Sequence, residues 1–281
     1  MERYSGTKKV NPPLVVCRSG PPFTDVCALQ GSLERAQVVD TQWLNSLLHD
    51  PNLIEWGGYN AALARVECSP KPPTTYMFGP LIDAPPSHPD TVLTTLSYFE
   101  KTLTELGVKT SNLSADMQLY IVATLIKWAS HGNRFKSVIL RPGGMHTLMS
   151  FNGCIGNLMK ASVLEVLVGA AFGGLTSIMN GKAWVKSMRA FRMVTAALLY
   201  DFLKNGPKTF EDISQYLDAA REHPIGRLWV DCLIRPTLSA HQFERAERDC
   251  DYLLQQHYYQ QMLPYFFAAS HCNTLDTLHG M

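Results

Sequence analysis

The chain has 281 residues, of which 46% are hydrophobic and 17% are charged, a composition typical of a folded globular protein and not of a disordered one. Lys and Arg total 25 against 24 Asp and Glu, so no global basic field exists and any nucleic-acid contact must come from a local patch. Seven cysteines, odd in number and without a C-x-x-C pair, argue against both a zinc ribbon and a disulfide framework.

The sequence also argues against secretion and membrane insertion. The N-terminal stretch "MERYSGTKKVNPPLVV" lacks the long apolar segment of a signal peptide. The most apolar window, "VLEVLVGAAFGGL", is too short for a membrane span and contains Glu165. We therefore expect a soluble intracellular protein with no membrane partner.

Residues 1–70 are predicted to form a loosely organised N-terminal segment, because prolines interrupt it and no periodicity is sustained. Its clear helical pattern is "VVDTQWLNSLLHD", for which Asp40 or Thr41 would be the N-cap. A proline-rich segment follows, in which Tyr76 to Asp83 fits a short strand.

Residues 71–160 have the rhythm of an α/β unit with parallel strands. The helical pattern "DTVLTTLSYFEKTLTELG" has Asp90 as its expected cap and Gly107 as its stop. A weak strand, "VKTSNLSA", then precedes the helix "DMQLYIVATLIKWAS", and a stronger strand, "FKSVILR", precedes the helix "HTLMSFNGCIGNLMK". Residues 161–281 read as a helical domain with a break at Pro236. The expected fold is α/β, with parallel strands followed by a mainly helical region.

Polar side chains follow the three predicted strands: Asp83 the first, Asp116 the second, and His146 the third, after the pair Gly143-Gly144. Functional groups collect beyond the carboxyl ends of parallel strands, and two carboxylates with a histidine could hold Mg²⁺ or Mn²⁺ for phosphoryl chemistry. Structural alternatives stay open: Asp116 as a helix N-cap, Asp83 as a turn residue, and His146 as a residue bonded to backbone at a helix start.

A basic stripe is the second candidate site. Its residues are spaced i, i+4, i+7 and i+10 on a predicted helix over 182–204: Lys182, Lys186, Arg189 and Arg192. Trp184, Met188 and Phe191 suit the buried side of that helix. The stripe is either a ridge that contacts DNA phosphates or an ordinary solvated face.

The runs "ADMQLYIVATLIKWA" and "VILRPGGMHTLMSFNGCIG" resemble a transposon-derived protein family that is multiplied in fish and marine invertebrate genomes. That family shares a D-x-Q element before Leu-Tyr, a G-G-x-H element, and blocks like "NGKAWVKSMRAFRMV", "RLWVDCLIRPTL" and "MLPYFFAA". The resemblance covers about Tyr76 to Ala269. It implies an RNase H-like core similar to that of Mutator-type transposases, so the sheet would be a partial RNase H-like sheet.

In such a DDE-type site, the resemblance implies that Asp116 is the second acidic metal ligand and His146 the histidine after the next strand. Asp83 is the nearby candidate for the first acid, and Glu165 and Asp201 are candidates for the third, although no motif selects them. After "PYFFAAS" the chain departs from the family pattern with "HCNTLDTLHGM". A truncated or decayed copy is therefore expected.

Two functions are carried forward. The first is a transposon-derived protein with an RNase H-like, metal-dependent nucleic-acid-processing core, which would act in the nucleus with Mg²⁺ or Mn²⁺. The second is a catalytically inactive helical interaction or DNA-binding protein, in which Asp116 caps a helix and His146 packs. DNA would be reached through the local basic helix face.

Overall fold

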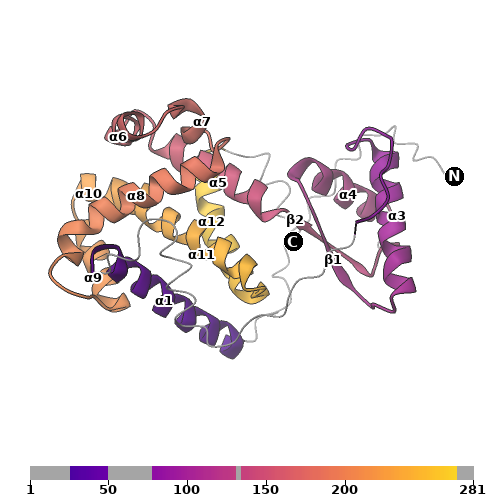
Figure 1. Ribbon diagram of the computed structural model, residues 1–281, viewed down its shortest axis with the longest axis horizontal. Coiled ribbons are helices and arrows are strands. Elements are labelled where there is room, and N and C mark those ends of the chain that lie inside the picture. The colour runs from indigo at the N-terminus through magenta and orange to yellow at the C-terminus, as the bar shows by residue number, and fades with distance from the viewer. Residues whose placement is uncertain (1–25, 50–77, 131–133, 271–281) are drawn as a thin grey trace. The chain divides into compact units, whose positions relative to one another are not determined.

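The computed structural model describes residues 26–49, 78–130 and 134–270 (Figure 1). These residues fall into two compact units, one comprising 78–147 and the other 26–49 with 148–270. The boundary lies within a helix, between Thr147 and Leu148, whereas the sequence pattern placed it near residue 161. None of the helices in these ranges combines the length and apolarity needed to cross a membrane.

The first unit is built on two parallel strands, β1 (Ser111–Ala115) and β2 (Val138–Pro142), which confirms the predicted pairing. The helix α3 (Pro89–Glu105) precedes β1, and α4 (Met117–Ala129) connects the two strands. In the register, Ser111 lies opposite Val138 and Ala115 opposite Pro142. Within the described ranges the sheet has these two strands alone, so the fold is mixed α/β with helices dominant.

Helices α3 and α4 form the core of this unit with one face of the sheet. Buried residues come from α3, α4, the turn before β2 and β2 itself: Val92, Leu96, Leu103, Ala123, Ile126, Phe135 and Val138. The strand predicted over 135–140 was expected to be buried, but it begins at Val138 and Ile139 is 43% exposed. Because helices cover one face, side chains of β2 alternate between core and solvent.

Two expectations near α3 were wrong. His88, not Asp90, is the N-cap, since its side chain accepts a hydrogen bond from the backbone N–H of Asp90. The strand expected from Tyr76 is absent from residues 78–83, which are irregular and exposed; Tyr76 and Met77 lie outside the described residues. Prolines at 80, 85, 86 and 89 remove backbone donors from this stretch and disfavour a paired strand. Gly107, with φ of 67°, ends the helical segment as predicted.

The second unit is helical. It contains α1 (Val26–His49), most of α5 (Gly144–Leu158), α6 (Val163–Ala171), α7 (Leu175–Met179), α8 (Trp184–Leu203), α9 (Phe210–Ala220), α10 (Pro224–Trp229), the π-helical turn η1 (Val230–Ile234), α11 (Arg235–Arg248) and α12 (Tyr252–Ala268). Near the break expected at Pro236 the chain forms η1, which ends two residues before the proline; there the N–H of Arg235 bonds to the carbonyl of Val230.

Helix α1 contains most of the helix predicted within the N-terminal segment and begins earlier, at Val26. Its residues Val39, Trp43 and Leu44 are buried in a core that includes Leu199 of α8. The helix begins at Val26, so Asp40 is not an N-cap; it is buried in mid-helix and accepts a hydrogen bond from the side chain of Gln242. Residues 1–25 and 50–70 lie outside the described residues.

Two glycines allow close contact between α5 and α7. A Cβ atom on Gly156 would lie 1.8 Å from the carbonyl oxygen of Met179. Gly181 has φ of +75°, and a Cβ there would lie 1.9 Å from the carbonyl oxygen of Met149. No side chain fits at these distances, so the approach of the two helices depends on glycine.

Candidate functional site

The carboxyl edge of the sheet carries the first pair of predicted site residues. Asp116 follows β1, and its Oδ1 accepts a hydrogen bond of 2.8 Å from the N–H of Leu119. Asp116 is therefore the N-cap of α4, which was the structural alternative for this residue. Its other carboxylate oxygen makes no hydrogen bond to the described part of the chain.

His146 lies beyond the same edge, in the first turn of α5, where it is half-buried. The N–H of Gly143 donates to the carbonyl of Ala115 at 2.6 Å and extends the strand pairing by one residue. A Cβ on Gly143 would lie 3.1 Å from that carbonyl oxygen and 3.9 Å from Cδ2 of His146. Gly143 thus allows the chain to turn tightly between β2 and the histidine.

The structure does not gather the remaining acidic candidates into a site. Asp83 is exposed in an irregular segment, and Asp201 is ion-paired on the surface with Lys204 at 2.6 Å. Glu165 lies in the first turn of α6. Among the residues that the structure describes, no three His, Cys, Asp or Glu side chains are close enough to hold a metal ion.

Helix α8 carries the predicted basic residues. Lys186 and Arg189 are exposed on the helix, and Lys182 is exposed just before it. Met188 and Phe191 are buried, as predicted, and Trp184 is half-buried. Three members of the predicted stripe therefore lie on an exposed surface.

Arg192 is the exception, and its place in the stripe was wrong. Its side chain is 5% exposed and its Nη2 donates to Oε2 of Glu244 at 2.7 Å. At 3.6 residues per turn, six residues leave Arg192 about 120° away from the direction of Lys186. That rotation turns Arg192 toward α11, against which α8 packs.

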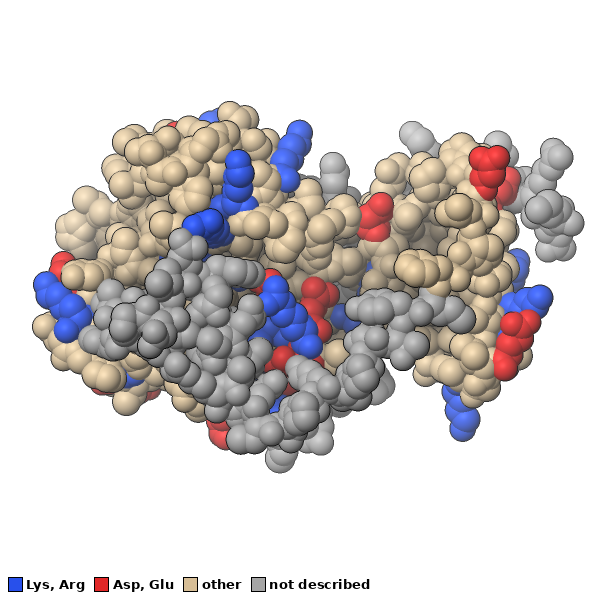
Figure 2. All heavy atoms as spheres, viewed as in Figure 1, with Lys and Arg blue, Asp and Glu red and all other residues tan. Residues whose placement is uncertain are grey.

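The stretch of sequence that contains the three exposed residues has more basic than acidic residues. Between Gly144 and Tyr200 the sequence contains five Lys or Arg residues and one acidic residue, Glu165. Figure 2 shows Lys and Arg side chains over α7 and α8 with few acidic side chains among them. In the described ranges, no ion pair involves Lys182 or Lys186. The chain is nearly neutral overall, but this part of the helical unit is basic.

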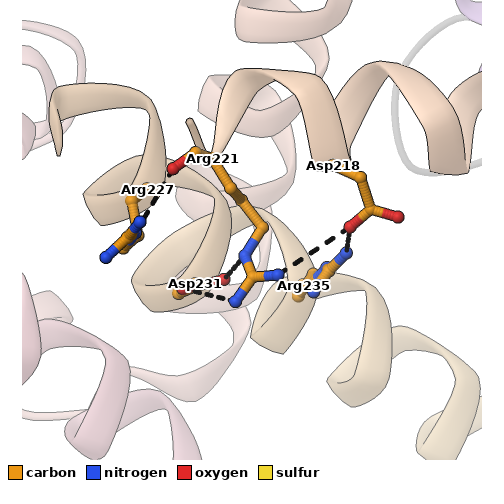
Figure 3. Close-up of polar contacts among 5 residues, drawn as sticks. All are labelled: Asp218, Arg221, Arg227, Asp231 and Arg235. Atoms are coloured by element: carbon orange, nitrogen blue, oxygen red, sulfur yellow. Dashed lines mark hydrogen bonds and ion pairs between the residues drawn. The ribbon is translucent and has the colours of Figure 1, made fainter. Parts of the chain in front are cut away.

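Arginines at the α9–α11 corner have structural partners instead (Figure 3). Arg221 donates to both carboxylate oxygens of Asp231, at 2.8 and 3.3 Å. Arg235 donates to Asp218 at 2.6 Å, and Nε of Arg227 donates to the backbone carbonyl of Arg221. These contacts hold α9 against η1 and α11. The arginines of this corner therefore have a structural role.

A buried polar cluster between α1, α8 and α11 was not predicted. His241 stacks on Trp43, with ring centroids 4.6 Å apart, and it is 2% exposed. Burial lowers the pKa of His241 well below its ordinary value, and the charges of Arg192, Arg245 and Arg248 lower it further. The sequence does hold a signal for this cluster, because His241, Glu244, Arg245 and Arg248 have the spacing of one helical face.

Comparison with known proteins gives one family. The family model described as "Domain of unknown function (DUF8702)" matches residues 55–207, more than half of the chain. No curated protein and no solved structure matches the chain. The matched range contains the sheet edge with Asp116 and His146, and the exposed residues Lys182, Lys186 and Arg189.

Proposed function

The chain belongs to the DUF8702 family. We propose that it binds DNA by contacting backbone phosphates through Lys182, Lys186 and Arg189. The observation that carries the proposal is their exposure on α8 and just before it, within residues 144–200, where Glu165 is the one acidic residue. Lysine ammonium and arginine guanidinium groups neutralise phosphates and release condensed counterions, which drives binding without sequence readout.

A matched pair of variants tests this proposal. K182E/K186E reverses two charges on the basic surface, and K109E/K136E makes the same change in net charge at two exposed lysines of the α/β unit. In fluorescence anisotropy with a labelled DNA duplex, we expect the first variant to lose most of the affinity and the second to keep it. Equal losses, or no binding by the wild-type chain, would contradict the proposal.

A second candidate function is metal-dependent nucleic-acid processing at the sheet edge, as in a transposase-derived enzyme with an RNase H-like core. One observation favours it: the parallel strands place Asp116 and the turn that leads to His146 at the same edge. Asp116 would contribute the carboxylate oxygen that does not bond to Leu119. Mg²⁺ and Mn²⁺ prefer such oxygen ligands. The metal would supply charge stabilisation at a phosphate.

The substitution Asp116→Asn tests the second candidate cleanly, because asparagine is as good an N-cap as aspartate but carries no charge. Metal-dependent nicking of supercoiled plasmid by the wild-type chain, lost in D116N, would support an enzyme. If the wild-type chain does not nick DNA, or if D116N nicks it equally well, Asp116 serves only as a cap.

A further inference from the structure

The two-stranded sheet has an open edge on β1. The N–H of Ser111 donates to the carbonyl of Ser137, and the carbonyl of Ala115 accepts from Gly143. Backbone groups of successive residues in a strand point to opposite sides. The odd-numbered residues of β1 therefore bond to β2, whereas the N–H and C=O groups of Asn112 and Ser114 point away from it.

These outward groups are unpaired and accessible. Asn112 and Ser114 are exposed, and none of the hydrogen bonds among the described residues involves their backbone groups. The strand, Ser-Asn-Leu-Ser-Ala, has no charged residue and no proline. Proteins commonly protect exposed strand edges with lysine, proline or a bulge, and β1 has none of these devices.

The opposite edge, on β2, is protected. The Nζ atom of Lys127 donates to the carbonyl of Val138 at 2.5 Å and occupies an acceptor on that side. Pro142, which ends the strand, has no N–H to offer. The β1 edge can therefore accept a strand, whereas the β2 edge is blocked at both of its ends.

We propose that the open edge of β1 pairs with β1 of a second copy of the chain, antiparallel across a two-fold axis. In this arrangement Asn112 lies opposite the partner's Ser114, and the outward N–H and C=O groups of each pair exchange two hydrogen bonds. The two strands carry no charge, so they do not repel each other. The resulting four-stranded sheet has a common size, whereas an isolated two-stranded sheet is marginal.

The blocked ends of the β2 edge explain why the occupant is a single second copy. After β1 has paired with β1, the two strands at the outside of the joined sheet are both β2, and both are protected by Lys127 and Pro142. Assembly therefore stops at a closed dimer and does not continue into a fibre. This inference does not rest on DNA binding.

The test is the mass of the full chain in solution, by sedimentation equilibrium at increasing concentration. We expect the wild-type chain to approach twice its 31.4 kDa mass. The variant N112K/S114K places like charges opposite each other across the axis and is expected to remain at the single-chain mass. T94K/T104K, which adds the same two charges at exposed positions of α3, should dimerise like the wild type.

Two results would overturn the proposal: a wild-type chain that stays at the single-chain mass, or an N112K/S114K chain that dimerises as the wild type does. Amide hydrogen exchange provides a readout that does not depend on a variant. The amides of Asn112 and Ser114 should become protected as the wild-type concentration rises. Protection that is already complete in the monomer would mean that another segment of the same chain covers this edge, which also overturns the proposal.

Discussion

Arg192 and Glu244 form an ion pair inside the helical unit, with 2.7 Å between Nη2 and Oε2 and side-chain exposures of 5% and 9%. Arg248 donates to the other carboxylate oxygen of Glu244 at 2.6 Å. The pair joins α8 to α11 over 52 residues of sequence. Burial makes each partner dependent on the other, because a single buried charge without its counterion is strongly unfavourable.

We therefore expect Arg192→Met to lower the free energy of unfolding by up to about 3–5 kcal/mol, since it removes the buried charge and leaves Glu244 paired with Arg248 alone. Lys186→Met, at an exposed position on the same helix, should change it by less than about 0.5 kcal/mol. Urea unfolding followed by circular dichroism measures both. If R192M were as stable as the wild-type chain, the ion pair would not be buried in solution.

The features predicted correctly from the sequence depend on local pattern. The parallel pairing of β1 and β2 follows from the strand–helix–strand order, because a helical crossover returns the chain in the same direction. The buried positions Met188 and Phe191 follow from helical periodicity. Each of these inferences used the order or the spacing of residues within one continuous stretch of the chain.

The features that were missed depend on distant residues. Arg192 looked like a surface arginine because its partner, Glu244, lies far along the chain. The N-terminal half of α1 has weak amphipathicity, and tertiary contacts such as the hydrogen bond from Ser32 to Asp251 hold it. The predicted strand at Tyr76 failed over residues 78–83, where β-type residues stand among prolines that cannot donate to a ladder.

Acid should destabilise the helical unit through His241. Burial and the neighbouring arginines lower the pKa of this residue in the folded chain. Below about pH 6.5 the unfolded chain binds a proton there and the folded chain does not, so the free energy of unfolding falls by up to about 1.4 kcal/mol per pH unit.

The substitution His241→Phe isolates this contribution, because phenylalanine can stack on Trp43 and has no titrating group. We expect the pH dependence of unfolding between pH 6.5 and 5, the range below the unfolded pKa of about 6.5, to be shallower in H241F than in the wild type. Burial also lowers the pKa of His257, so part of the slope should remain. Identical slopes in the two proteins would show that His241 is protonated in the folded chain.

Two Gly→Ala substitutions should have opposite effects on stability, because Gly156 lies in the contact between α5 and α7 and Gly31 lies in an open position of α1. Gly156→Ala would place a Cβ 1.8 Å from the carbonyl oxygen of Met179 and should destabilise the chain by about 1–3 kcal/mol or more. Gly31→Ala, in an exposed position of α1 with nothing within 4 Å, should stabilise it by about 0.4–1 kcal/mol. Thermal unfolding of both variants measures the difference. A neutral G156A would contradict the close approach of these helices.

If Asp116 caps α4, its substitution by alanine should lower stability more than its substitution by asparagine. Asp116→Ala should lower the free energy of unfolding by about 0.5–2 kcal/mol, because the N–H of Leu119 loses its acceptor. Asp116→Asn should leave stability almost unchanged. Chemical denaturation of the three proteins gives the comparison. If D116N were as unstable as D116A, the charge of the carboxylate and not its capping oxygen would be the stabilising feature.

The salt dependence of DNA binding is the most direct measure of phosphate contacts by Lys182, Lys186 and Arg189. In a plot of log Kobs against log salt concentration, each contact contributes a slope of about −0.9, so these three residues account for at most about −2.7. The triple variant K182Q/K186Q/R189Q should therefore show a slope that is shallower than that of the wild type by up to this amount. Equal slopes for the two proteins would contradict phosphate binding at this surface.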